Sequence, residues 1–257
     1  MINPPGLHAI MVSVDFSDIL ALTLPYNRHH FEKVTLITSS ADYRSVQDIA
    51  DVCDARVLVT DLFYANGAMF NKWAALEWAL DQIGREGWLV FLDADILWPK
   101  EVPSMREYVY IPGNLYVPHR RIMLTGWNAS NVYDESAWER NHVDPVNEHA
   151  GYSQIFHCSD PHLGAPPWHR MDYIHAGVAD SIFQLKWNPM NKKRPPFLVL
   201  HIGPSGVNWC GRAMPYLNGD PPIEAAERLA KLRDMLSRRS SLAGSIDERC
   251  AHERIKK

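Results

Sequence analysis

Short apolar runs alternate with longer amphipathic segments over the first hundred residues. Four runs are rich in β-branched and apolar side chains and predict β-strands, at residues 8–14, 33–38, 55–60 and 88–92. Before the last of them, Trp73, Leu76, Leu80 and Ile83 recur at steps of three and four residues, which predicts a helix over 71–84. Strands that alternate with helices favour right-handed crossovers and a mainly parallel sheet with helices on both faces.

The pattern changes after residue 100. Residues 107–118 predict two short strands around a Pro-Gly turn, and the polar, aromatic-rich segment 119–150 predicts a long, irregular functional loop. Further strands are expected at 151–157 and 197–202, with a helix near 178–187. The whole pattern therefore predicts an α/β protein.

Composition excludes several classes of protein. Of the 257 residues, 46% are apolar and 22% are charged, and the formal net charge is −4. These are the proportions of a globular protein, and they exclude a disordered, collagen-like or coiled-coil chain. The N-terminus shows no basic segment followed by an apolar run, and no apolar stretch approaches the ~20 residues that cross a bilayer. We therefore expect a soluble, cytoplasmic protein without a transmembrane segment.

Two carboxylates directly follow the apolar strand predicted at 88–92. Asp93 and Asp95 are separated by one residue, and alternation along an extended chain points both to the same side. Open α/β sheets bind ligands at the carboxyl ends of their parallel strands. Such a pair can hold a hard divalent cation and leave coordination positions for a diphosphate. The alternative is a pair of acids that caps a turn or a helix.

Three other residues stand at the ends of predicted elements. His201 opens a Gly-rich loop after an apolar strand, where its imidazole is either a metal ligand or a half-buried group bonded to the backbone. Asp180 precedes an amphipathic helix and is either a general base for a hydroxyl or a helix cap. Lys72 begins the helix over 71–84, where it either binds a phosphate or is simply solvated.

These motifs, in this order, resemble those of the GT-A glycosyltransferases, which transfer a sugar from a nucleotide-sugar donor. Leu-Asp-Ala-Asp at 92–95 is similar to their DxD motif, which binds the metal and the donor diphosphate. His-Ile-Gly at 201–203, with Trp209, is similar to a metal-binding histidine loop of several of these families. Residues 177–183 resemble the Gly-Gly-Glu-Asp-Asp segment of the β-1,4-galactosyltransferase group, and residues 151–154 resemble its acceptor-side strand.

The resemblance spans roughly residues 8 to 212, and it extends to family-2-type enzymes of bacteria and phages. It implies a hexosyltransferase with one GT-A (Rossmann-like) catalytic domain, a Mn²⁺ or Mg²⁺ cofactor and a nucleoside-diphosphate sugar, preferably a UDP-sugar, as donor. A phage-encoded enzyme would work in the host cytoplasm. The implied boundaries are 1–222 for this domain, 1–100 for its nucleotide-sugar-binding half, 101–222 for its acceptor half, and 223–257 for a C-terminal helix and polar tail.

The roles that the resemblance implies carry over residue by residue. Asp180 would be the catalytic base. The metal ligands would be Asp93, Asp95 and His201. The acceptor would contact Tyr152 and Gln154. The donor would contact Val14, Ser39, Asp42, Asn71, Lys72, Asp93, Asp95 and Trp209.

The chain departs from the family pattern at three places. Family-2 enzymes usually carry paired acids after the second strand to hold the nucleobase, whereas this chain has Thr-Ser-Ser-Ala-Asp at 38–42, so Asp42 or the serines would take that role. The Gly-Gly-Glu-Asp-Asp pattern is reduced to one acid, Asp180. The histidine loop lacks the lysine of some retaining relatives and has Val207-Asn208 before Trp209, which favours an inverting mechanism.

Two other functions fit part of the pattern. A nucleotidyltransferase would carry a Gly-rich, basic loop after the first strand, where this chain has Val-Asp-Phe-Ser-Asp at 14–18. A catalytically silent carbohydrate-binding protein would keep the fold without turnover. The sequence leaves the acceptor open, and a glycan, a lipid-linked sugar, a protein and a modified DNA base are all compatible with it.

Overall fold

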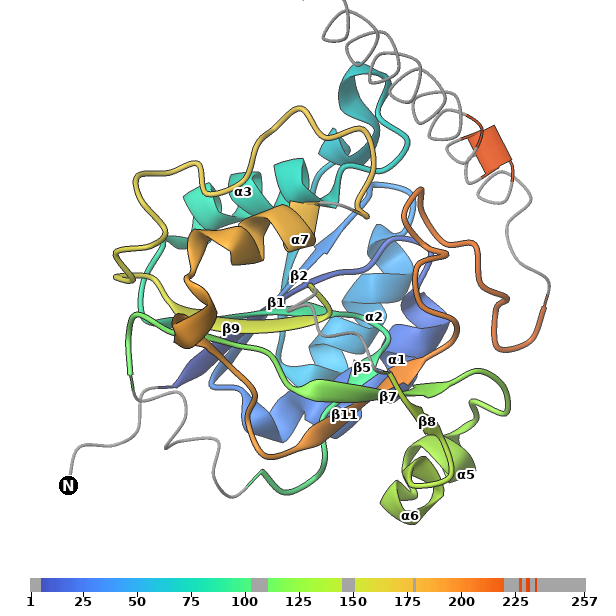
Figure 1. Ribbon diagram of the computed structural model, residues 1–257. Helices are drawn as coiled ribbons and strands as arrows, with labels where there is room; N and C mark the ends of the chain where they lie inside the picture. The colour runs from blue at the N-terminus through green and yellow to red at the C-terminus, as the bar shows by residue number, and fades with distance from the viewer. Residues whose placement is uncertain are drawn as a thin grey trace, which may run out of the picture.

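The chain folds around one large and one small β-sheet. The computed structural model describes residues 6–102, 111–144, 151–177 and 179–219, together with residues 227, 230, 231 and 234. Within this part of the chain the large sheet has seven strands and the small sheet has four (Figure 1). Four of the six strand pairs in the large sheet are parallel. The predicted α/β class with a mainly parallel central sheet is confirmed.

Four parallel strands form one half of the large sheet. They are β1 (Leu7–Val12), β2 (Lys33–Thr38), β3 (Arg56–Val59) and β4 (Trp88–Asp93). Their spatial order is β4-β1-β2-β3, so the four strands predicted from apolar runs are all present. The direction of winding reverses beside β1. In open α/β sheets, ligands bind at the carboxyl ends of the strands that flank such a reversal.

The helices that connect these strands lie on both faces of the sheet. Helices α1 (Ser17–Asn27) and α2 (Tyr43–Cys53) contact each other on one face. Helix α3 (Lys72–Ile83) lies on the opposite face (Figure 1). Right-handed crossovers require this arrangement, because the connection to β4 runs across the sheet in the reverse direction.

Helix α3 begins and ends where the sequence predicts. The side chain of Asn71 accepts a hydrogen bond from the Ala74 N–H at 3.0 Å, which satisfies one of the free donors of the first turn. Gly84 ends the helix with a φ of 86°, a conformation that costs glycine little. Asn71 also donates to the Met171 carbonyl at 2.9 Å, so the same residue fixes a distant loop against the start of α3.

Three more strands complete the large sheet, and a short helix lies between two of them in the chain. Strand β9 (Ser153–His157) is antiparallel to β4 and to β6 (Leu115–Tyr116), and β10 (Lys192–Lys193) is parallel to β6. The helix expected near 178–187 consists of α7 (Ala179–Phe183) and a following 3-10 turn. The first strand expected within 107–118 lies largely outside the described residues. The 3-10 helices span Arg28–His30, Leu62–Gly67, Gln184–Lys186 and Pro189–Asn191.

The small sheet corrects the prediction of an irregular loop over 119–150. Its strand order is β5-β11-β7-β8, and two of its strands come from that segment. The strands are β5 (Ile96–Leu97), β11 (Leu198–Ile202), β7 (His119–Met123) and β8 (His142–Val143). The same segment holds helices α5 (Ala129–Val132) and α6 (Glu135–Trp138).

The sequence pattern did not predict strand β7, because one of its buried residues is an arginine. Arg120 is only 9% exposed, and its guanidinium is paired with the Asp144 carboxylate at 2.6 Å. The sequence His-Arg-Arg-Ile-Met therefore lacks the alternation of a half-buried strand, although parallel pairing with the apolar β11 holds it in place.

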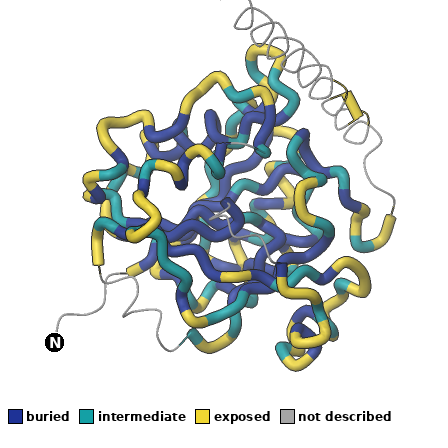
Figure 2. Tube along the Cα trace, in the orientation of Figure 1, coloured by how far each residue is buried: buried dark blue, intermediate teal, exposed yellow. Residues whose placement is uncertain are grey.

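An aromatic cluster joins helices α3 and α7 beside the large sheet. The ring of His169 stacks between those of Trp73 on α3 and Phe183 on α7, with centroid distances of 4.2 and 4.3 Å. The His169 side chain also contacts the Glu77 carboxylate at 2.7 Å. Figure 2 shows that the strands and this layer are buried, whereas exposed residues concentrate in the connections. The cluster fixes the spacing between α3 and α7.

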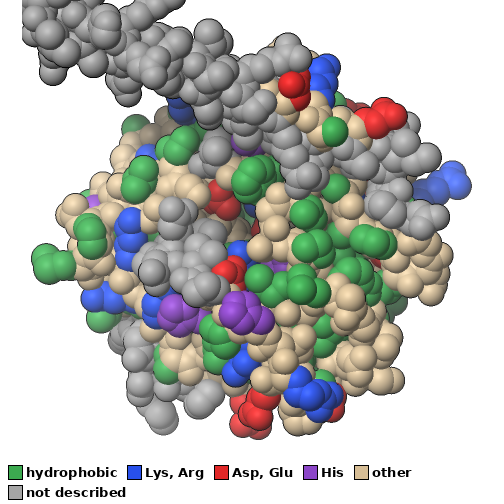
Figure 3. Space-filling model, turned by 45° about the vertical axis from the view of Figure 1, so that its right-hand side comes forward, with side chains coloured by type: hydrophobic (Ala, Val, Ile, Leu, Met, Phe, Trp, Pro, Cys, Tyr) green, Lys and Arg blue, Asp and Glu red, His purple; other side chains and the backbone are tan. Residues whose placement is uncertain are grey.

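The C-terminal region is described at four positions, Glu227, Ala230, Lys231 and Asp234, which are all helical and exposed. The rest of the expected C-terminal helix and polar tail over 223–257 lies outside the described residues. Within the described part of the chain, no helix combines the length and the apolar character needed to cross a membrane. On the face shown in Figure 3, acidic, basic and histidine side chains gather near the centre beside a broad apolar area.

Candidate functional site

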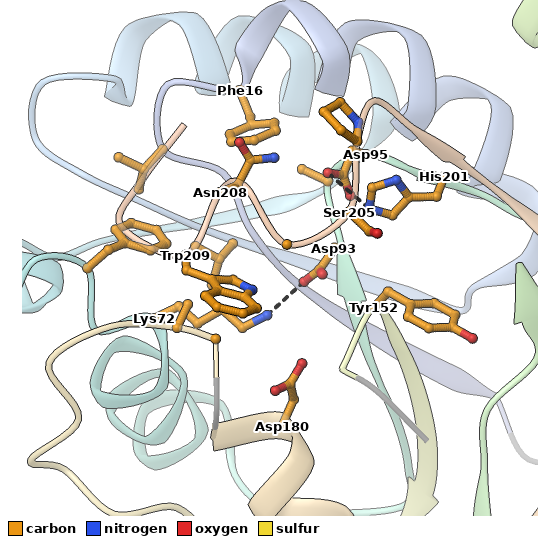
Figure 4. A pocket seen from close by; sticks show the side chains of 18 of the residues that line it. Phe16, Lys72, Asp93, Asp95, Tyr152, Asp180, His201, Ser205, Asn208 and Trp209 are labelled. Atoms are coloured by element: carbon orange, nitrogen blue, oxygen red, sulfur yellow. Dashed lines mark hydrogen bonds and ion pairs between the residues drawn. The ribbon is translucent and has the colours of Figure 1, made fainter. Parts of the chain in front are cut away.

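The residues predicted to carry chemistry converge on one cavity. It has a volume of about 330 Å³ and lies at the carboxyl ends of β1 and β4 (Figure 4). The predicted residues that line it are Val14, Lys72, Asp93, Asp95, Tyr152, Asp180, His201 and Trp209. They come from both sheets and from both faces of the large sheet. The cavity is thus built at the reversal of winding, where this class of sheet binds ligands.

Lys72 and Asp93 form an ion pair inside the cavity. The Lys72 Nζ lies 2.9 Å from Asp93 Oδ1, and the Lys72 side chain is 12% exposed. Burial lowers the pKa of Lys72, but the carboxylates of Asp93, Asp180 and Asp95 outweigh it and hold this pKa above its ordinary value. The lysine is therefore a charged group that interacts with all three acids, rather than a solvated side chain.

Asp95 lies deeper than Asp93 and faces His201. The His201 Nε2 is 3.8 Å from Asp95 Oδ2, and Asp95 Oδ1 is buried without a hydrogen-bond partner in the described structure. Burial raises the pKa of Asp95, although His201 opposes this shift. The other ring nitrogen of His201, Nδ1, lies 2.9 Å from the Gly203 carbonyl oxygen and must carry the proton of that hydrogen bond. In the neutral ring, Nε2 then presents its lone pair toward Asp95.

The small sheet brings His201 and Asp95 together. His201 pairs with Ile96 across β11 and β5, and the Ile202 N–H donates to the Asp95 carbonyl at 2.8 Å. Helix α1 holds the same segment from the other side, because the Thr23 hydroxyl donates to the Ala94 carbonyl at 2.6 Å. The backbone that carries the two acids is therefore fixed on both sides.

Asp180 lies in the first turn of α7 with its carboxylate directed into the cavity (Figure 4). Its Oδ2 accepts a hydrogen bond from the Gly151 N–H at 2.9 Å, and its Oδ1 accepts one from the Ser181 N–H at 2.8 Å. A Cβ at Gly151 would come within 2.2 Å of the Asp180 Cβ, so only glycine fits there. The carboxylate bridges α7 and the start of β9, which is more than an N-terminal cap requires.

Trp209 closes one side of the cavity. Its carbonyl accepts the Ala176 N–H at 2.9 Å, and its ring lies against Gly177, where a Cβ would come within 2.2 Å of the indole. Asn208 accepts hydrogen bonds from the N–H groups of Ala213 and Met214 at 2.9 and 3.2 Å, which fixes the loop that carries the indole.

Four predicted site residues do not line the cavity: Ser39, Asp42, Asn71 and Gln154. Ser39 and Asp42 line a neighbouring hollow of about 340 Å³, which shares Val14 with the main cavity. Asp42 Oδ2 accepts hydrogen bonds from the Asp15 N–H at 2.8 Å and the Ser39 hydroxyl at 3.1 Å, so it braces the loop after β1. Asn71 is the buried cap of α3.

The acceptor-side residues differ from each other in position. Gln154 is fully buried in β9 and donates to the Asp180 carbonyl at 3.4 Å, so it supports α7 from below and does not line the cavity. The ring of Tyr152 lines the cavity, while its hydroxyl donates to the Pro118 carbonyl at 2.6 Å.

Several lining residues were not among the predicted site residues, and two of them, Arg120 and Phe16, are large side chains. Arg120 lines the cavity with its guanidinium 4.4 Å from the centre of the Tyr152 ring. Phe16 lies on the opposite side, packed 5.0 Å from the guanidinium of the buried Arg212. Arg212 donates to the Asp18 carboxylate and to the Asp15 carbonyl, and so binds the C-terminal loop to the loop after β1. Neither Arg120 nor Phe16 lies in one of the motifs, so the local sequence does not mark either of them as a site residue.

No protein-family model and no curated protein sequence matches the chain. Among solved structures it is similar to the bifunctional glycosyltransferase WbbM, with 11% identity over 76% of this chain and 40% of that one, at a TM-score of 0.44. It is also similar to the galactosyltransferase LgtC, solved with donor and acceptor sugar analogues, with 11% identity over 60% of this chain and 58% of that one, at a TM-score of 0.37.

A third similar structure is 4-diphosphocytidyl-2C-methyl-D-erythritol synthase of Anaerococcus prevotii, with 10% identity over 90% of this chain and 98% of that one, at a TM-score of 0.39. The matched region spans less than two thirds of WbbM and of LgtC. These similarities are confined to the arrangement of the backbone.

Proposed function

We propose that the protein is a metal-dependent glycosyltransferase that transfers a sugar from a nucleoside-diphosphate sugar, preferably a UDP-sugar, to an acceptor hydroxyl with inversion. The observation that carries this proposal is the convergence of three carboxylates and one lysine on a single cavity. The carboxylates of these three acids, Asp93, Asp95 and Asp180, act on Lys72 in the cavity beside β1, where the direction of winding reverses. One cavity of ligand size would therefore contain ligands for a cation, a group that binds the diphosphate and a general base.

Asp95 and His201 have the chemistry of ligands for Mn²⁺ or Mg²⁺. A cation beside the buried, unpartnered Oδ1 of Asp95 would compensate the charge of this carboxylate, because burying an unpaired charge costs free energy. His201 donates its Nδ1 proton to a backbone carbonyl, which is the usual arrangement of a metal-binding histidine. In the described residues no three side chains form a complete metal site, so the diphosphate would supply further ligands. A bound cation would neutralise the charge that develops on the leaving diphosphate.

Lys72 and the β1 side of the cavity suit the donor. The ammonium group offers three donors to phosphate oxygens. The neighbouring hollow at Ser39 and Asp42 shares the lining residue Val14 with the cavity and would take the nucleoside end. Trp209 would cover the donor from the loop after β11. In this arrangement the sugar would lie between Asp93 and Asp180.

Asp180 is suited to act as the base. A carboxylate oxygen would take the proton of the acceptor hydroxyl as the acceptor oxygen bonds to the anomeric carbon and the bond from that carbon to the diphosphate breaks. The N–H groups of Gly151 and Ser181 hold the carboxylate in place during this step. The Tyr152 ring and Arg120 would border the acceptor. Attack from the side opposite the leaving group inverts the anomeric centre.

The loop after β1 disfavours the nucleotidyltransferase alternative. It carries Asp15 and Asp18 rather than glycines and basic side chains. The guanidinium of Arg212 is bound to Asp18 at 2.9 Å and is therefore not available to a triphosphate.

Donor hydrolysis separates an enzyme from a silent carbohydrate-binding protein. We expect release of nucleotide from one member of a panel of UDP-, GDP- and CDP-sugars with Mn²⁺, and loss of this release with excess chelator. NMR of the first sugar product would show the inverted anomeric configuration. A protein that binds a nucleotide sugar but releases no nucleotide under any condition would be a binding protein.

Replacing His201 with alanine should raise the Mn²⁺ concentration needed for half-maximal activity by about 10- to 100-fold. The variant loses one ligand while the carboxylates remain, so activity at saturating Mn²⁺ should largely return. The measurement is donor hydrolysis across a Mn²⁺ titration. His29→Ala, an exposed histidine bonded to the Lys100 carbonyl, is the control. An unaltered titration would assign His201 a purely structural role.

Replacing Gly177 with alanine should weaken UDP binding by about tenfold or more. The new Cβ would displace the Trp209 indole, and overpacking of this kind typically costs about 1–3 kcal/mol. Titration calorimetry with UDP and Mn²⁺ measures the effect. Gly219→Ala is the matched control, because the nearest atom to its Cβ would be 3.9 Å away. Equal UDP affinity in the two variants would remove Trp209 from the donor site.

A further inference from the structure

The charges around the cavity are arranged with Lys72 as their common counter-ion. Asp93, Asp95 and Asp180 all line the cavity, and each acts on the Lys72 ammonium. Arg120 also lines it, but its charge is balanced by Asp144 at 2.6 Å. Lys72 is therefore the cation paired with Asp93, while His201 and Arg120 also act on the charge of Asp95.

Lys72 binds one of the two carboxylate oxygens of Asp93. The Nζ–Oδ1 distance is 2.9 Å (Figure 4). The ammonium also lies 4.8 Å from the centre of the Trp73 ring. Asp93 is the more exposed partner, with 37% of its side chain accessible. A divalent cation bound between Asp93 and Asp95 would have to displace this ammonium or be repelled by it, because like charges at contact distance interact strongly.

We propose that Lys72 occupies the position of the divalent cation in the donor-free protein and moves from Asp93 to the diphosphate when the donor binds, so that cation and donor bind together. This inference rests on the proposed function for its donor. The aliphatic part of lysine has four rotatable bonds, so the ammonium can change partners without movement of α3. The exchange releases Asp93 at the moment when the diphosphate can supply the missing ligands.

One further observation agrees with this role. Asp95 Oδ1 stays unpartnered although Asp93 is paired, so only one of the two acids has a partner for its charge at the cavity. This is expected when a lysine occupies one ligand of the site.

The test is Mn²⁺ binding without activity as the readout. In Lys72→Met, Mn²⁺ affinity in the absence of donor should increase by at least about tenfold, measured by electron paramagnetic resonance of free Mn²⁺. UDP affinity at saturating Mn²⁺ should decrease by at least about tenfold, measured by calorimetry. The factor by which UDP strengthens Mn²⁺ binding should therefore shrink, since such coupling is reciprocal.

Three variants provide the comparison. Lys72→Gln keeps a hydrogen-bond donor for Asp93 without the charge and should behave like Lys72→Met. Lys72→Arg keeps the charge and should keep the weak donor-free Mn²⁺ binding of the natural protein. Lys33→Met, at the amino end of β2, makes the same change in net charge at the opposite edge of the sheet and should alter neither affinity. Thermal unfolding of each variant verifies that it folds.

The outcomes separate this inference from the function on which it rests. Unchanged donor-free Mn²⁺ affinity in both uncharged variants, with Mn²⁺ and UDP binding otherwise intact, would overturn the role of Lys72 and leave the glycosyltransferase proposal standing. Equal Mn²⁺ affinity of the natural protein with and without UDP would do the same. Failure of the natural protein to bind Mn²⁺ under either condition would overturn the metal site and this inference with it.

Discussion

Asp95→Ala should abolish metal-dependent donor hydrolysis and transfer, with a loss of at least about 10²- to 10³-fold. The substitution removes the buried carboxylate that faces His201, and loss of preorganised stabilisation of a developing charge has effects of this size. The neighbouring Asp93 cannot compensate, because it is the more exposed acid and would already be a ligand of the same cation. Activity is measured with the donor identified in the panel of nucleotide sugars.

The same substitution should leave the melting temperature unchanged or raise it. Burial raises the pKa of Asp95, which means that folding disfavours its charged form. Its ionisation therefore opposes folding at neutral pH, and this cost sets in as the pH rises above the pKa of the unfolded chain. Removal of the carboxylate removes the cost. The loss of activity should thus occur without a loss of stability.

Asp172→Ala is the control for this prediction. Asp172 is an exposed acid paired with Arg170 at 2.6 Å in the loop after β9, and its removal should not affect turnover. Full activity of Asp95→Ala, or full activity of the natural protein with excess chelator, would contradict the assignment of Asp95 to the cation.

Asp180→Asn should reduce transfer by at least about 10²-fold while donor affinity persists. The amide keeps the shape of the side chain but cannot accept the proton of the acceptor hydroxyl, and general-base contributions are typically about 10²–10⁴-fold. Donor contacts lie on α3, β4 and the loop after β11, so they should remain. The two measurements are the single-turnover transfer rate and the dissociation constant for UDP with Mn²⁺.

A structural role for Asp180 predicts a different result. An asparagine oxygen can still accept one of the hydrogen bonds from Gly151 and Ser181, while its NH2 group would face the other N–H. A residue that only holds α7 in place would therefore lower the melting temperature when replaced, but the folded protein would keep most of its transfer rate. Asp51→Asn on α2, bonded to Gln47 at 2.6 Å, makes the same change away from the cavity. Transfer by Asp180→Asn at the rate of this control would leave the base unassigned.

The sequence by itself determined the parallel half of the fold. The apolar runs of β1, β2, β3 and β4 and the periodicity of α3 are local patterns, and Asn71 and Gly84 mark the ends of that helix by local hydrogen bonding and backbone freedom. Because Asp93 and Asp95 follow β4 directly, their position at the carboxyl edge of the sheet was also predictable. These features depend on residues within one or two turns of each other.

Only the tertiary structure decided which distant residues meet those acids. His201 reaches Asp95 through the pairing of β11 with β5, and Arg120 reaches the cavity because Asp144 neutralises it in an otherwise polar strand. The contact between Lys72 and Asp93 joins a helix on one face to a strand end across the sheet. Strand pairing and ion pairs between distant segments leave no periodicity in the sequence, because they depend on how whole elements pack rather than on the order of neighbouring side chains.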